Sequence, residues 1–149
     1  MSNFLTDGRE ALLAALKADA GIAARVKTFY EFGSGLLKRA ASEPSDCPAL
    51  SVTPSEMRRV PVANVEREIP QSLRVRVTTA GQDVEPCEEL AALVMACVEG
   101  ADETALGLAA EGLTGLRVRS VGWDARPRRG AAQVLWTASV EIVLLWRRR

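Results

Sequence analysis

The last part of the chain, from Val134 to Trp146, has the alternation of a long β-strand. One face of this strand carries Val134, Trp136, Ala138, Val140, Ile142, Leu144 and Trp146. Toward its end the other face also becomes apolar, at Val143 and Leu145. A strand that is apolar on both faces is buried on both. It is therefore either central in a sheet or an edge that a partner buries, so the rest of the chain has to supply strands and a covering layer.

Other segments have the composition of shorter strands. Val60 to Ile69 and Leu73 to Thr79 are expected to form two antiparallel strands, and Leu116 to Trp123 a third that precedes the last one. Ala49 to Thr53 is a short strand that Pro54 ends, and Thr28 to Phe32 is ambiguous.

Two segments have helical periodicity. Thr6 or Asp7 is expected to cap a first helix that Gly21 ends, followed by one short helical turn. Pro86 and the acids around it predict a second helix up to Glu99, closed by Gly100. The apolar stripe of the second helix consists of Leu90, Leu93, Val94, Cys97 and Val98.

This order of elements predicts the α+β class. We expect a mostly antiparallel sheet of about four to five strands, packed on one face by two main helices. The 149 residues fit a single domain, 1–149, and a hydrophobic fraction of 48% is sufficient for a core. No segment has the apolar length of a membrane span, and the N-terminus lacks the features of a signal peptide.

Charge is balanced over the chain but is segregated along it. Nineteen basic and nineteen acidic residues cancel. The segment from Asp83 to Glu111 contains eight acids and no base, whereas Leu113 to Arg149 contains eight arginines and two acids. This segregation suits self-association or docking, and an ordinary solvated helix face with charged strand ends fits it equally well.

The residues that most enzymes need are missing. Without any histidine, the chain lacks the commonest general base and the commonest nitrogen ligand of metals. The three cysteines do not have zinc spacing, since Cys87 and Cys97 lie about 15 Å apart on one helix. No phosphate-binding or dinucleotide motif is present. We therefore expect a protein that is not an enzyme, with no catalytic residues, no cofactor and no metal.

Arginines on the polar sides of the predicted strands, and in the loop after them, are the candidate interface residues. They are Arg74, Arg76, Arg117, Arg119, Arg126, Arg128 and Arg129. Alternation places the first four opposite at least part of the core side, where they are available to partners. Their expected counterparts are acids of a neighbouring copy or phosphates of DNA, and protection of strand ends is the alternative explanation.

The order and size of these elements resemble a known family. The resemblance rests on the helix LTDGREALLAALKADAGIAARV, the strands CPALSVTP and IPQSLRVRVTT, the helix EPCEELAALVMACVEG, and the hairpin LRVRSVGW with VLWTASVEIVLLWR. Together they are similar to tail-terminator or tail-completion proteins of long-tailed bacteriophages and related prophages. The resemblance covers nearly the whole chain and includes no catalytic or ligand motif.

The resemblance implies a structural protein of the virion, assembled in the host cytoplasm, that caps the tail tube. Its expected partners are copies of itself in a homohexameric ring, the tail tube protein, the neck connector or stopper protein, and DNA contacted non-specifically in the lumen. It implies no membrane. The alternatives are a head-completion or stopper protein of the neck and an accessory nucleic-acid-associated factor.

Overall fold

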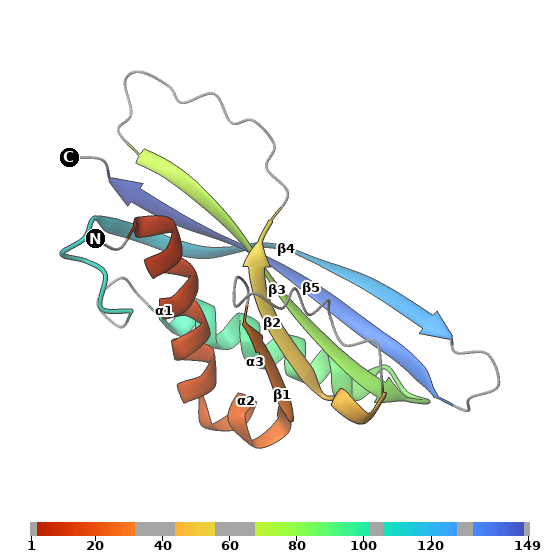
Figure 1. Ribbon diagram of the computed structural model, residues 1–149. Coiled ribbons are helices and arrows are strands. Elements are labelled where there is room, and N and C mark those ends of the chain that lie inside the picture. Colours follow the sequence, from red (N-terminus) through yellow and green to blue (C-terminus); the bar gives the residue numbers. More distant parts are fainter. Residues whose placement is uncertain (1–2, 32–43, 56–67, 102–105, 128–132, 148–149) are drawn as a thin grey trace.

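The structure, a computed structural model, describes residues 3–31, 44–55, 68–101, 106–127 and 133–147 (Figure 1). Within these ranges, three helices pack on one face of a five-stranded sheet, so the α+β class and the mostly antiparallel sheet are confirmed. A short 3-10 helix, Pro44–Asp46, precedes the second strand.

The first two helices begin at side-chain caps. Helix α1 spans Phe4–Ala18, and Asn3 caps it by accepting a hydrogen bond from the Thr6 backbone N–H at 2.9 Å. Asp19 ends α1 and caps α2, Ala20–Arg25, through the Ile22 N–H. The expected cap at Thr6 or Asp7 and the expected break at Gly21 are therefore wrong. The side-chain oxygens of Asn and Asp accept hydrogen bonds from the free N–H groups of a first helical turn. Asn3 and Asp19 do so from the position directly before their helices.

Helix α3 spans Glu85–Gly100, close to the predicted bounds, with Pro86 in its first turn. The stripe that it buries consists of Cys87, Leu90, Ala91, Val94 and Val98. Leu93 and Cys97 lie at the margin of the stripe and are only half-buried, because they face the other helices. Leu93 lies over Gly21 of α2, and Cys97 Sγ lies 3.8 Å from the Ala15 carbonyl oxygen of α1.

The sheet has the strand order β1-β2-β3-β5-β4. Its strands are β1 Thr28–Glu31, β2 Ala49–Pro54, β3 Glu68–Gly81, β4 Leu113–Pro127 and β5 Val134–Arg147. β1 and β2 are parallel, and the other neighbours are antiparallel. β5 lies between β3 and β4, so of the two alternatives left by its two apolar faces, the central position is correct.

The predicted pair of strands around Ile69 and Leu73 is wrong where the structure describes it. β3 runs without a turn from Glu68 to Gly81 and pairs with β5 along this whole length, while 60–67 lie outside the described residues. Pro70 does not break the strand. The pairing of β3 with β2 ends at Leu73, and Pro70 lies beyond that point. The N–H that proline lacks is therefore not needed for a hydrogen bond to β2.

The core lies between the helices and one face of the sheet, called here the inner face. It includes Leu12 and Leu16 of α1, Leu90 and Val94 of α3, and the odd-numbered β3 residues from Leu73 to Val77. The even-numbered residues of β3 point to the opposite, outer face.

Helix α1 is held on the sheet by a buried polar contact. Gln71 Oε1 accepts a hydrogen bond of 2.9 Å from the Trp146 indole N–H, and Gln71 Nε2 donates one of 2.7 Å to the Leu5 carbonyl. Phe4 packs edge-on against the Trp146 ring, with 5.3 Å between the ring centroids. Gly8 allows this approach, since a Cβ there would lie 2.5 Å from Gln71 Oε1 and 2.9 Å from Trp146 Cζ2.

We expect Gly8→Ala to destabilise the protein by about 1–3 kcal/mol, although alanine is the better helix former. The added methyl group has to displace Gln71 Oε1, and two hydrogen bonds, one at Oε1 and one at Nε2, hold this carboxamide in place. Urea unfolding measures the difference. The matched control is Gly21→Ala in α2, where a new Cβ meets no atom closer than 3.3 Å. An equal or higher stability of Gly8→Ala would contradict the tight contact.

Candidate assembly surfaces

The outer face of the three long strands carries polar and charged side chains. Strand register and alternation place on it Arg74, Arg76 and Thr78 of β3, Thr137, Ser139, Glu141 and Val143 of β5, and Arg117, Ser120, Gly122, Asp124 and Arg126 of β4. Four of the arginines predicted as interface residues thus come together on one side of the molecule. Arg119 lies at the register shift between Val118 and Ser120, and Arg128 and Arg129 lie outside the described residues.

Arg74 is already used within the chain. It lies directly opposite Glu141, and its Nε is 2.6 Å from Glu141 Oε1. Both side chains are partly shielded, and cross-strand pairs of opposite charge contribute roughly 0.2–1 kcal/mol. Arg74 therefore stabilises the sheet and is a weaker candidate for an interface than the sequence suggested.

The other arginines differ in their availability. Arg126 Nε lies 3.3 Å from Asp124 Oδ2, but both groups are highly exposed, so solvent screens the pair. Arg76 is half-buried and lies between Ser51 of β2 and Ser139 of β5.

Arg117 and Arg119 are exposed and make no hydrogen bond or ion pair with another described residue. Among the described arginines of the predicted set, they are the two that are exposed and have no such partner.

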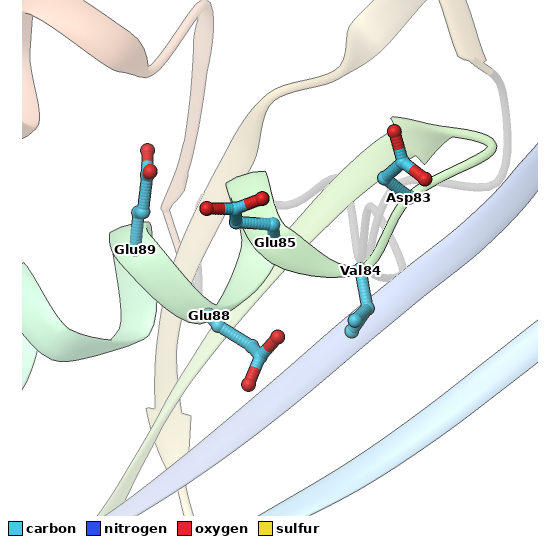
Figure 2. Close-up of a pocket in the computed structure, with 5 residues that line it drawn as sticks. All are labelled: Asp83, Val84, Glu85, Glu88 and Glu89. Atoms are coloured by element: carbon cyan, nitrogen blue, oxygen red, sulfur yellow. The ribbon is translucent and has the colours of Figure 1, made fainter.

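An acidic surface lies on the helix layer. Asp83, Val84, Glu85, Glu88 and Glu89 line a shallow depression at the start of α3. The carboxylates of its first turn interact favourably with the helix dipole. Figure 2 shows Glu89 directed away from the sheet, whereas Glu88 and Val84 point toward the strands.

The two charged surfaces lie on opposite sides of the molecule. α3 packs on the inner face through Cys87 and Leu90, and its acids are on the exposed sides of the helix. The outer-face arginines point away from that layer. The charge segregation seen along the sequence is therefore also a segregation in space.

The cysteines provide no reactive site. Burial raises the pKa of the Cys87 thiol, whose Sγ lies 3.5 Å from the Trp136 carbonyl oxygen. Burial is also the main cause that raises the pKa of Cys47 and of Cys97, with nearby Asp46 and Asp19 adding to it. At neutral pH the thiols are protonated, the less nucleophilic form.

Within the described ranges, no three His, Cys, Asp or Glu residues are grouped as a metal ion would require. No helix in the described part of the chain has the length and apolarity of a membrane span.

Sequence reasoning missed one exposed aromatic residue. Trp123 was expected simply as part of a strand, yet it is 52% exposed, the most of the large apolar side chains that the structure describes. Strict alternation along β4 would place Trp123 on the face of Arg117 and Arg119, but the register shift between Val118 and Ser120 turns it to the inner face, opposite Ala138.

Residues 10–140 match the protein family described as Tail completion protein gp17. The fold is similar to that of a chain in the virion of a native gene transfer agent (GTA) particle, with a TM-score of 0.60 and 17% identity over 96% of this chain and 99% of that one. A crystal structure from Akkermansia muciniphila matches with a TM-score of 0.34 and 14% identity over 68% of this chain and 42% of that one, too weakly to carry an argument. No curated protein matches the chain.

Proposed function

The chain belongs to the tail completion protein gp17 family, and from this membership we propose that it caps a phage-like tail tube as a ring of identical copies. It is a structural tail protein and a component of the virion. In the proposal, the ring stops polymerisation of the tube and joins the tail to the head-side connector. This role requires no catalysis, and we propose that the chain has none.

The two oppositely charged surfaces support a ring. A ring forms when one surface of a subunit binds a different surface of the next and the rotation closes. Here the outer-face arginines and the α3 acids lie on opposite sides of the molecule, so each copy offers both halves of such a contact. Complementary charge mainly steers association and fixes register, which suits an assembly that must close correctly.

The remaining partners follow from the same role. One rim of the ring would contact the tube protein and the other the neck connector or stopper. Arginines that are not used between copies would face the lumen, where DNA phosphates pass.

The test is termination of tube growth in vitro. The tube protein of the cognate tail is polymerised with and without the purified chain, and tube lengths are measured by electron microscopy. We expect shorter tubes with a ring at one end, and lengths that fall as the ratio of chain to tube protein rises. A heat-denatured sample of the chain is the control. Tubes of unchanged length with bare ends, at an excess of folded chain, would refute the proposed role.

A further inference from the structure

A row of paired residues crosses the inner face of the sheet and ends at Trp123. Leu50 of β2 pairs with Val77 of β3, Val77 with Ala138 of β5, and Ala138 with Trp123 of β4. The first three side chains are 0% exposed, whereas Trp123 is 52% exposed. The layer that buries this row therefore stops between β5 and β4.

The position of α3 explains where the cover stops. Cys87 Sγ lies 3.9 Å from the Val77 carbonyl oxygen and 3.5 Å from that of Trp136, so the helix begins over β3 and β5. β4 is the edge strand next to β5 (Figure 1). Ala125 follows Trp123 on the same face and is also exposed. The end of β4 thus presents an uncovered apolar surface.

One side of α3 borders this surface. Leu93 and Cys97 face α2 and α1, so the opposite side of the helix faces β4. At about 100° per residue, Val84 and Glu88 fall on that opposite side. Figure 2 agrees, since both side chains point toward the blue strands. Val84 and Glu88 thus lie on the side of α3 toward β4, where Trp123 and Ala125 are exposed on the same face of the sheet. We call these four residues the Trp123 strip.

We propose that the Trp123 strip of one copy binds Arg117 of a second copy of this chain. A guanidinium can stack on the exposed indole face while it pairs with a carboxylate, a combination that suits arginine better than lysine. Arg74 and Arg126 have carboxylate partners within the chain, and Arg76 is half-buried. Arg117 is exposed and its pairing with Val143 sets it on the outer face of β4, whereas Arg119 lies at the register shift and has no strand partner that sets its face.

The features of β4 favour a contact through its faces rather than its edge. The strand has two register shifts, it carries exposed Arg119, and it ends at Pro127. Bulges, charges and proline on an edge strand oppose pairing with the edge of another sheet.

The contact would also be heterologous. The strip lies on the inner face and Arg117 on the outer face, so each copy has one donor and one acceptor surface. This deepens the proposed function, since such a contact continues from copy to copy until a ring closes.

The test is the association of the purified full chain, measured by sedimentation over a range of concentrations. We expect masses above the 16.0 kDa of one copy. Trp123→Ser and Glu88→Arg should each weaken association by about tenfold or more. Combining Glu88→Arg with Arg117→Glu should restore much of the loss, because the charges are exchanged across the contact.

The matched control is Glu89→Arg, the same charge change at a residue directed away from the sheet. It should associate nearly as the unchanged chain does. All variants should remain folded with only small shifts of the urea midpoint, since the substituted side chains are exposed and Glu88→Arg removes only a weak interaction with the helix dipole. A chain that stays at 16.0 kDa at every concentration, or a Trp123→Ser variant that associates normally, would overturn the proposal.

Tube termination separates this proposal from the proposed function. If Trp123→Ser associates normally and still terminates tubes, the strip is wrong and the capping role stands. If the unchanged chain associates through the strip but leaves tube length unaffected, the capping role is wrong and the strip stands.

Discussion

Replacing Leu90 by alanine is expected to lower the free energy of unfolding by about 2–5 kcal/mol, a large part of the stability of a domain of this size. Leu90 is 1% exposed and lies in the middle of the α3 stripe that packs on the sheet. The truncation removes buried apolar surface and leaves a cavity that the rigid strands beneath it fill only in part. Urea unfolding followed by circular dichroism gives the value directly.

The neighbouring residue offers a matched control. Glu89 is exposed on the same turn, so Glu89→Ala should change stability by less than about 0.5 kcal/mol. Leu93→Ala should fall between the two, because Leu93 is half-buried against α2. Equal losses for Leu90→Ala and Glu89→Ala would show that α3 buries a different face.

Gln71→Leu is expected to cost about 2–4 kcal/mol, even though leucine is the more apolar residue. The substitution removes the acceptor of the Trp146 indole N–H and the donor to the Leu5 carbonyl. A buried donor without a partner costs more than an average hydrogen bond contributes. Because Leu5 is in α1, the loss should also loosen that helix, which amide hydrogen exchange in 4–18 would detect.

A double-mutant cycle with Trp146→Phe isolates this contact. Phenylalanine keeps an aromatic ring but removes the N–H, so the single variant leaves Gln71 Oε1 without its donor. With both groups apolar, neither is left unsatisfied, and the double variant should be more stable than the sum of the single effects by about 0.5–3 kcal/mol. Strict additivity would mean that the two side chains do not interact.

Much of the local structure could be predicted because it depends on neighbours in sequence. The start of α3 followed from Pro86 and the first-turn acids, although Ala101 and not Gly100 caps its end, and the alternation of β5 indicated a strand apolar on both faces. The errors arose where two local signals competed. Asn3 and Asp19 caps took precedence over the expected Thr6 or Asp7 cap and the Gly21 break, and Pro70 did not interrupt β3.

The sequence by itself determined which residues share a face of a strand without register shifts, such as β3, because side chains alternate along it. It therefore placed Arg74 beside Arg76, whereas the face of Trp123 depends on the register shift after Val118, which alternation does not indicate. Only the tertiary structure decided which residues lie opposite one another and how far α3 extends over the sheet. Strand register places Arg74 opposite Glu141 and leaves Arg117 exposed. The position of α3 leaves Trp123 exposed. The physical reason is that register and helix placement minimise the free energy of the whole core, to which residues far apart in sequence contribute together.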